Sequence, residues 1–277
     1  MMLHPESRGR LQLSAVIITR DEERHLPACL DSLRGVADEL IVVDDHSRDR
    51  TRPIAAAWGA RIYARHFDWS ARQMNYGLEQ ARAPWVLLID ADERLSDELK
   101  QEIRTVLLDP GGCRGFFLPR KNHVFGRWLR HGGNYPDYNA VRLFRRGCGR
   151  FRDQPIHSPL ELDGRAGYLR APLLHDSYRN LHDYYAKFNS YTSLEAEGMR
   201  RKGRHFSWPR MLTTAGGHFV RRLIWQSAYL DGWPGVVYCL LGLHYDLVRF
   251  WKLRERGMNT QVAMRAVTTA NTEPACE

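Results

Sequence analysis

Cysteine is scarce in this chain, and its few cysteines are far apart. Only five occur among 277 residues, and no two form a Cys-x-x-Cys pair. Small disulfide-stapled domains use a dense set of cysteines, and structural zinc sites use closely spaced pairs. The sequence therefore argues against both kinds of cross-link and is typical of a protein from a reducing compartment.

Long hydrophobic runs are also missing. The longest apolar stretch without a charged residue is Gly232–Tyr245, fourteen residues long, whereas a membrane-spanning helix needs roughly 20. The first ten residues hold no apolar core of the kind found in signal peptides. We therefore expect a cytoplasmic protein.

Two common phosphate-binding signatures do not occur. The chain contains neither a Gly-x-x-x-x-Gly-Lys-Ser/Thr loop nor a Gly-x-Gly-x-x-Gly turn. These glycine-rich turns bring backbone N–H groups close to phosphates in NTPases and dinucleotide enzymes. Ordinary members of both classes are therefore disfavoured.

Charge is present in excess but unevenly. Lys and Arg number 41 against 32 Asp and Glu, which gives a net charge of +9. Residues 1–110 hold 15 bases and 19 acids, while residues 111–277 hold 26 bases and 13 acids. An excess of base predicts an acidic partner, and the division suggests that the two parts meet different partners. A non-catalytic module that binds nucleic acid or membrane is the alternative, but it predicts base spread over the whole chain, so we expect no nucleic-acid partner.

Strands and helices alternate over the first 110 residues, which predicts an α/β fold with a doubly wound, mostly parallel sheet. Short apolar, β-branched runs predict strands at Leu13–Thr19, Glu39–Val43, Ala60–Ala64 and Pro84–Ile89. Helical spacing predicts helices at Asp21–Leu33, Thr51–Trp58, Ser70–Ala81 and Ser96–Leu108.

Acidic pairs follow two of these strands. Asp90 and Asp92 come directly after the third strong strand, and Asp44 and Asp45 after the second. Ligands bind outside the carboxyl ends of such strands, and paired carboxylates suit Mg²⁺ or Mn²⁺. We interpret the first pair as a metal site and the second as a ribose or base contact. A solvated turn, or a cap for the helix at Thr51, is the alternative.

Three segments resemble, in order and spacing, the family 2 glycosyltransferases of the GT-A fold. They are VIITRDEE, VVDDHSRDRT and ARQMNYGLEQARAPWVLLIDADE, within a resemblance that covers roughly residues 12–150. The resemblance implies transfer of a sugar from a nucleotide diphosphate, with inversion and with Mg²⁺ or Mn²⁺. It implies that the donor is bound by Thr19, Arg20, Glu22, Asp45, Arg72 and Asp90, and the metal by Asp92.

Inverting transfer needs a base that takes the proton of the attacking acceptor hydroxyl. Family members often carry a Glu-Asp pair shortly before an arginine; the matching stretch here is Asn134–Tyr138, followed by Arg142. Glu is missing, so Asp137 is the candidate catalytic base by position. A turn aspartate after Pro136 is the alternative.

The middle of the chain is similar to a bacterial subgroup that adds glucose to a heptose of the lipopolysaccharide inner core. The matching segments are Arg120–Gly147, Pro155–Leu162 and Leu173–Gly198. This similarity implies UDP-glucose as donor and a phosphorylated, lipid-linked saccharide as acceptor. An exopolysaccharide lipid intermediate and a peptide are alternative acceptors.

Further candidates follow from this subgroup. His157 stands where members read Val-His-Glu, and is interpreted as a third metal ligand, a phosphate contact or a structural histidine. His131 and Gly132 form either an acceptor cradle or a plain loop. Arg142 and Arg145 open an arginine-rich run suited to acceptor phosphates, or to a solvated face.

We expect four segments along the chain. Residues 1–114 form the nucleotide-sugar-binding part of a GT-A domain, and residues 115–178 its acceptor-binding part. Residues 179–257 form a helical region, and residues 258–277 a loose tail. The apolar stretch Gly232–Tyr245 has basic flanks. It is interpreted either as peripheral contact with the anionic inner face of the cytoplasmic membrane or as a core helix.

Overall fold

The structure is a computed structural model that describes the backbone of residues 11–153 and 159–270, and the side chains of residues 11–153 and 159–257. The chain divides into two compact units. The first consists of Met1–Trp128 and Asn134–Ser177, and the second of Leu129–Gly133 and Tyr178–Glu277. Each unit is described separately below.

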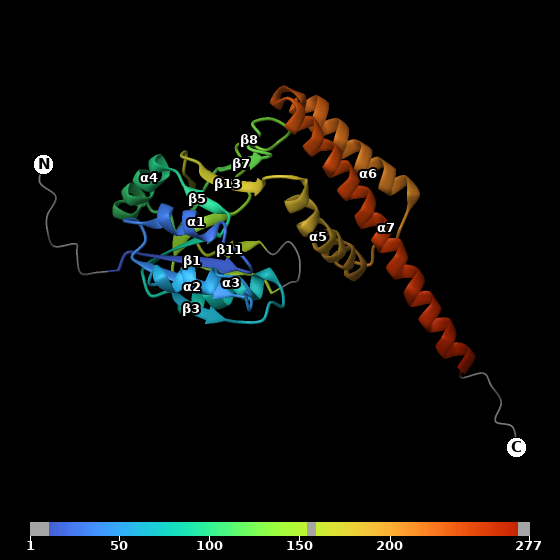
Figure 1. Cartoon of the computed structure of the whole chain (residues 1–277), viewed down its shortest axis with the longest axis horizontal. Helices are drawn as coiled ribbons and strands as arrows, with labels where there is room; N and C mark the ends of the chain where they lie inside the picture. Colours follow the sequence, from blue (N-terminus) through green and yellow to red (C-terminus); the bar gives the residue numbers. More distant parts are fainter. Residues whose placement is uncertain (1–10, 154–158, 271–277) are drawn as a thin grey trace, which may run out of the picture. The chain divides into compact units, whose positions relative to one another are not determined.

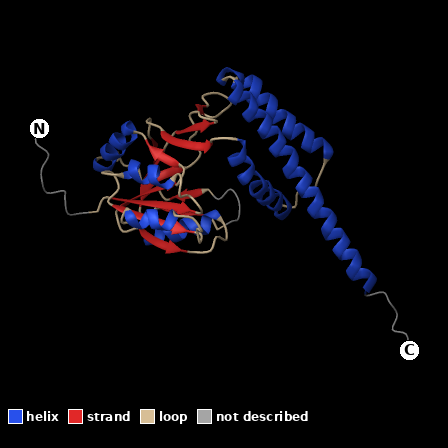
Figure 2. Ribbon diagram, viewed as in Figure 1, coloured by secondary structure: helices blue, strands red, loops and turns tan. Residues whose placement is uncertain are grey.

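A mixed sheet forms the centre of the first unit (Figure 2). Among the described residues it has seven strands in the order β12-β6-β9-β4-β1-β2-β3. The parallel part is made of β1 (Leu13–Thr19), β2 (Glu39–Asp44), β3 (Arg61–Ala64) and β4 (Trp85–Asp90). Across the sheet, β9 (Val141–Arg145) runs antiparallel to both β4 and β6 (Gly115–Phe117), while β12 (Ala166–Tyr168) pairs parallel with β6.

Helices cover both faces of this sheet, as the buried strand pattern requires. Alternate residues of β1 lie in two separate apolar clusters: Ile17 packs with α1 (Leu26–Leu33) and α4 (Asp97–Leu108), and Val16 packs with α3 (Ser70–Gln80). On the α3 side the approach is very close, because a Cβ at Gly77 would lie 2.5 Å from Val16 Cγ1. The predicted α/β class with a mostly parallel sheet is confirmed.

The first helix begins later than predicted. It was expected from Asp21, but α1 starts at Leu26. Asp21 has a φ of 54°, outside the helical region. The backbone N–H groups of residues 21–23 donate to side chains of the loop before and at the start of α2 (Thr51–Ala57), namely Ser47, Thr51 and Asp49. These bonds hold residues 21–25 as a loop beside the ends of β1 and β2.

A smaller sheet extends the first unit beyond β4. Its order is β5 (Glu93–Leu95), β13 (Leu173–Tyr178), β7 (Arg120–Val124) and β8 (Arg127–Trp128). The antiparallel pairing of β13 with β5 places His175 opposite Glu93. The short strands β10 (Gly149–Phe151) and β11 (Leu160–Leu162) form a separate antiparallel pair. The smaller sheet was not predicted, and it brings residues from the second half of the chain to the acids after β4.

The second unit is helical, as expected for the C-terminal extension. It contains α5 (Leu181–Arg201), α6 (Trp208–Val220), the π-helix η2 (Arg221–Trp225), the 3₁₀ helix η3 (Ala228–Asp231) and α7 (Trp233–Ala270). Its apolar core joins α5, α6 and α7 through Ala196, Met199, Met211, Phe250 and Leu253. No helix within the described residues is both long and apolar enough to span a membrane.

Two expectations for this unit need adjustment. The helical region was expected to end at residue 257, but α7 continues to Ala270, because no proline after Pro234 interrupts it. The stretch Gly232–Tyr245 lies mostly in α7, where Cys239 and Leu241 are buried. Tyr184 of α5 donates a hydrogen bond to the Leu241 carbonyl at 2.9 Å. Much of this stretch therefore packs inside the helical unit.

Candidate active site

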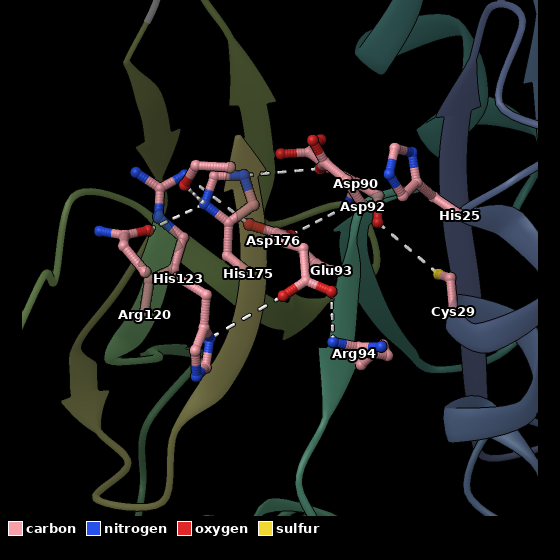
Figure 3. A network of polar contacts seen from close by, with 12 residues as sticks. His25, Cys29, Asp90, Asp92, Glu93, Arg94, Arg120, His123, His175 and Asp176 are labelled. Carbon is pink, nitrogen blue, oxygen red and sulfur yellow. Dashed lines mark hydrogen bonds and ion pairs between the residues drawn. The ribbon is translucent and has the colours of Figure 1, made fainter. Parts of the chain in front are cut away.

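Asp90, Asp92 and Glu93 lie where β4 ends and β5 begins. The Glu93 side chain is fully buried and accepts a hydrogen bond from the Asp90 backbone N–H at 2.9 Å. The guanidinium of Arg142 on β9 lies 3.1 Å from Asp90 Oδ2 and 3.3 Å from Glu93 Oε1. Figure 3 displays the acids with the histidines and Arg120 around them. One buried arginine thus balances two carboxylates at this end of the sheet.

Burial shapes the charges of this cluster. Loss of solvent raises the pKa of Glu93, although Arg142 opposes the rise. Burial alone would lower the pKa of Arg142, but Asp90 and Glu93 outweigh it and the pKa is raised. Arg142 is therefore always charged, and its charge is balanced by Asp90 and Glu93 within the protein. Its side chain is only 9% exposed and is engaged by Asp90 and Glu93, and its predicted contact with acceptor phosphates stays a prediction.

Asp92 lies next to a histidine from the smaller sheet. Asp92 Oδ1 is 3.6 Å from His175 Nε2, and both side chains are largely buried. His175 Nδ1 lies 2.8 Å from Asn122 Oδ1. The amide nitrogen of Asn122 donates elsewhere, to Asp137 and to the Asn134 carbonyl, so its oxygen faces the imidazole. Ser177 Oγ also lies 2.9 Å from Nδ1, so Asn122 and Ser177 together hold the imidazole with Nε2 facing Asp92.

Asp137 belongs to the same network. Its Oδ2 accepts hydrogen bonds from Arg120 Nε at 3.0 Å, from Arg120 Nη2 at 2.8 Å and from Asn122 Nδ2 at 3.4 Å. Arg120 Nη1 also lies 3.8 Å from Glu93 Oε1. Asp137, Asn122, His175 and Asp92 therefore form a continuous chain of polar contacts. The structure brings together the predicted catalytic base and the predicted metal ligand.

The residues predicted to bind the donor lie mainly at the ends of β1 and β2. Thr19 Oγ1 donates to Asp44 Oδ1 at 3.1 Å. Arg20 is 68% exposed and pairs with the buried Asp45 at 2.7 Å. Glu22 lies in the adjoining loop, with Oε2 2.8 Å from His25 Nδ1. These residues share the sheet edge that holds Asp90.

Arg72 lies on the neighbouring helix α3. It stacks on Trp69, with 3.7 Å from the guanidinium carbon to the ring centre, and pairs with Asp153 at 3.0 Å. A cavity of about 410 Å³ adjoins this helix and is lined by Ser70, Met74, Leu88, Asn139, Ala140, Arg142, Phe151 and Pro159. It lies between α3, β4 and β9, on the side of the sheet that carries Arg72.

The remaining acceptor candidates are not gathered at this site. Arg145 pairs in register with Trp85 at the start of β4, because β9 runs antiparallel to β4, and stacks over that ring at 5.1 Å. It lies at the opposite end of β4 from Asp90, so we do not retain it as an acceptor contact. His131 and Gly132 belong to the second unit, where His131 Nδ1 is 2.7 Å from Asp231. His157 lies outside the described residues.

Sequence reasoning missed Glu93, Asn122, Arg120 and His175 as members of the site. Glu93 and His175 stand inside segments that carried the family resemblance, next to residues that were singled out. Their proximity follows from the pairing of β5 with β13, strands about 80 residues apart. A histidine followed by acid and serine, predicted on a strand, is the signal that would have identified His175.

A metal at this site would have two protein ligands. Within the described residues, no group of three or more His, Cys, Asp or Glu side chains is arranged to hold a metal ion. Asp92 and His175 nevertheless present a carboxylate oxygen and an imidazole nitrogen 3.6 Å apart, close enough to share one divalent cation. The donor set fits a cation that also takes ligands from its substrate.

The sequence matches a known family over the segment that carries this site. The model of glycosyl transferase family 2 matches residues 14–173, which include β1, β4, β5 and the Asp137 region. The chain belongs to this family. It is therefore a glycosyltransferase, and the predicted family and GT-A fold class are confirmed.

Two relatives of similar length are named as glycosyltransferases. The lipopolysaccharide core biosynthesis glycosyltransferase LpsC of Rhizobium meliloti is 28% identical over 254 residues, covering 89% of this chain and 93% of the relative. An uncharacterized glycosyltransferase of Rickettsia typhi is 25% identical over 260 residues, covering 90% and 89%. Among solved structures, S. aureus TarS 1-349 is 15% identical with a TM-score of 0.47, and the match covers 90% of this chain and 92% of that 1-349 chain.

Proposed function

We propose that this chain is an inverting, metal-dependent hexosyltransferase that moves glucose from UDP-glucose to a heptose of the lipopolysaccharide inner core. The observation that carries the proposal is the linked pair of sites at the end of β4. Asp92 and His175 form a candidate metal site, and Asn122 connects His175 to Asp137, the candidate base. Membership of family 2 supports sugar transfer, and the link between the two sites supports a metal-dependent, single-displacement reaction.

Each residue has a proposed task. Asp92 and His175 would hold Mg²⁺ or Mn²⁺. The bound cation would neutralise the negative charge of the leaving diphosphate. Asp137 takes the proton of the acceptor hydroxyl while that oxygen forms its bond to the anomeric carbon and the carbon–diphosphate bond breaks on the opposite face. Arg142 and Arg120 hold the acids in position. The nucleotide is bound by Thr19, Arg20, Glu22, Asp45, Arg72 and Asp90.

Binding of the nucleotide requires one local change. Asp45 is paired with Arg20, and its other oxygen accepts from the Phe67 backbone N–H at 3.1 Å. Arg20 is exposed and long, so it can swing away at little cost. We propose that a base N–H then takes its place on Asp45 while Arg20 turns to the diphosphate.

The acceptor assignment is supported by the relative from Rhizobium meliloti, whose name places it in lipopolysaccharide core biosynthesis. A phosphorylated, lipid-linked acceptor also agrees with the excess of base in residues 111–277. We further propose that the protein contacts the inner face of the cytoplasmic membrane peripherally, because such an acceptor is anchored there. His131 and Gly132 are proposed as acceptor contacts of the second unit.

A donor screen tests this function. The purified full chain is incubated with UDP-glucose, UDP-galactose, UDP-N-acetylglucosamine and GDP-mannose, each with heptosylated core lipid and Mn²⁺. We expect transfer from UDP-glucose and its loss on chelation. Transfer from UDP-glucose to an exopolysaccharide lipid or a peptide, but not to core lipid, would overturn the acceptor assignment and leave the chemistry intact.

A further inference from the structure

The second unit exposes an unusual group of large apolar side chains. From η2 to the first residue of α7, five large apolar residues within ten positions are each more than half exposed, and Trp225 reaches 78%. We call this group the 224–233 tip; it consists of Ile224, Trp225, Tyr229, Leu230 and Trp233. It lies at one end of the side-by-side pair α6 and α7 (Figure 1). Isolated exposed apolar residues are ordinary, but a contiguous group marks an interaction surface.

The charge around the tip has one sign. Arg221 and Arg222 precede it, and Asp231 is the only acid between residues 221 and 233. The Asp231 side chain is 4% exposed and is bound to the imidazole and backbone N–H of His131. The charge that this segment presents to a partner is therefore positive.

The backbone conformation and close packing of residues 227–235 fix the position of the tip. Ser227 has a φ of 55°, which turns the chain sharply between η2 and η3. A Cβ at Gly235 would lie 2.1 Å from the Ala228 carbonyl oxygen, so η3 packs directly on the first turn of α7. The buried Ala228 fixes η3 while Tyr229 and Leu230 on the same turn remain outside. The apolar side chains are thus held outward by packing on the helix pair.

We infer that the 224–233 tip inserts into the interface of an anionic lipid bilayer. Tryptophan and tyrosine favour the level of the lipid headgroups, where an apolar ring and a polar N–H or O–H are both satisfied. Leu230 and Ile224 enter the acyl boundary, and Arg221 and Arg222 meet anionic headgroups. The basic flank, with its single acid covered, matches the negative charge of an anionic lipid surface. The tip, not the stretch Gly232–Tyr245 as a whole, forms the attachment, and this inference deepens the membrane contact proposed above.

Vesicle binding tests the inference without donor or acceptor. The full chain is mixed with sedimenting vesicles of phosphatidylcholine alone or of phosphatidylcholine with phosphatidylglycerol. Leu230→Ser and Trp225→Ser are compared with Leu108→Ser, a matched change at an 87% exposed leucine of α4 in the first unit. Arg221→Gln is compared with Arg165→Gln, an exposed arginine of the first unit.

We expect binding to the anionic vesicles that falls with added salt. Leu230→Ser and Trp225→Ser each weaken it about tenfold or more, and Arg221→Gln weakens it severalfold. Leu108→Ser and Arg165→Gln leave it unchanged. Equal loss in the Leu108→Ser control, or no binding by the wild type, overturns the inference.

A second copy of the chain is the competing occupant. Sedimentation velocity without lipid decides this point: a wild-type dimer that Leu230→Ser converts to a monomer overturns membrane insertion. Transfer activity on a water-soluble heptoside is measured in parallel. If the wild type transfers sugar but does not bind vesicles, the inference about the tip alone is rejected. If the wild type binds vesicles but transfers no sugar, the proposed function alone is rejected.

Discussion

The acidic end of β4 and the 224–233 tip differ in which kinds of side chain they bury and which they expose. At the end of β4, Glu93 is fully buried, and Arg142 lies against it at 3.3 Å. At the tip, apolar rings and arginines face solvent, and the one acid is covered. A site that positions a charged substrate needs fixed, balanced charges, whereas a surface that meets a membrane needs exposed apolar area. Changes at the end of β4 should therefore alter sugar transfer and leave vesicle binding unchanged.

Loss of the metal ligand should have the largest effect. Asp92→Asn removes a charge that the cation needs, so transfer should fall by about a thousandfold or more. Sugar transfer with Mn²⁺ measures the effect, and Asp163→Asn, a change at an 83% exposed aspartate of the same unit, is the control. Vesicle binding should not change. Full activity of Asp92→Asn would remove Asp92 from the metal site.

Removal of the base should stop turnover and leave donor binding. Asp137→Asn keeps the size of the side chain and removes its capacity to accept a proton, so kcat should fall about 10²–10⁴-fold. UDP affinity, measured by calorimetry with Mn²⁺, should match that of the wild type. If UDP binding is lost together with turnover, Asp137 has a structural role and the assignment as base is wrong.

The buried arginine should matter for folding as well as for chemistry. Arg142→Met leaves two carboxylates without their cation, so the free energy of unfolding should fall by about 3–5 kcal/mol. Urea unfolding measures this change. Adding Glu93→Gln to Arg142→Met should recover part of the loss, since one buried charge is then removed. An unchanged unfolding free energy in Arg142→Met would mean that the cluster is not desolvated.

The smallest of these effects is expected at the residue that orients His175. Asn122→Ala removes the hydrogen bond to Nδ1 and lets the imidazole change its orientation, so Mn²⁺ affinity in the presence of UDP should fall about 10–100-fold. Asn122→Asp, which keeps the acceptor oxygen, should retain more affinity than Asn122→Ala. Equal affinity in the two variants would show that the hydrogen bond to Nδ1 does not orient the metal ligand.

The sequence predicted the sheet better than it predicted the site. Strands β1, β2 and β4 are continuous apolar runs because both of their faces are buried, and such runs are visible in a sequence. Because β4 ends in acids, the location of Asp90 and Asp92 followed directly. The start of α1 was misplaced because side chains some 25 residues away hold the loop that contains Asp21.

Long-range pairing explains what could not be predicted. His175 reaches Asp92 only through the pairing of β13 with β5, which no local pattern encodes. Arg142 and Arg145 are three residues apart on β9, yet one is buried beside Asp90 and the other lies over Trp85 at the opposite end of β4. Their placement depends on the antiparallel register of β9 with β4. The run of arginines in the sequence suggested a single phosphate-binding face. In the fold, these arginines lie in different places.

The most direct test of the account is a titration of Mn²⁺ followed by electron paramagnetic resonance, in which bound Mn²⁺ loses the free-ion signal. It is performed with the full chain and saturating UDP, and repeated with Asp92→Asn and His175→Ala. The account predicts one Mn²⁺ bound per wild-type chain in the presence of UDP and markedly weaker binding in both variants. Wild-type affinity in both variants would contradict the central claim that Asp92 and His175 form the metal site of this glycosyltransferase.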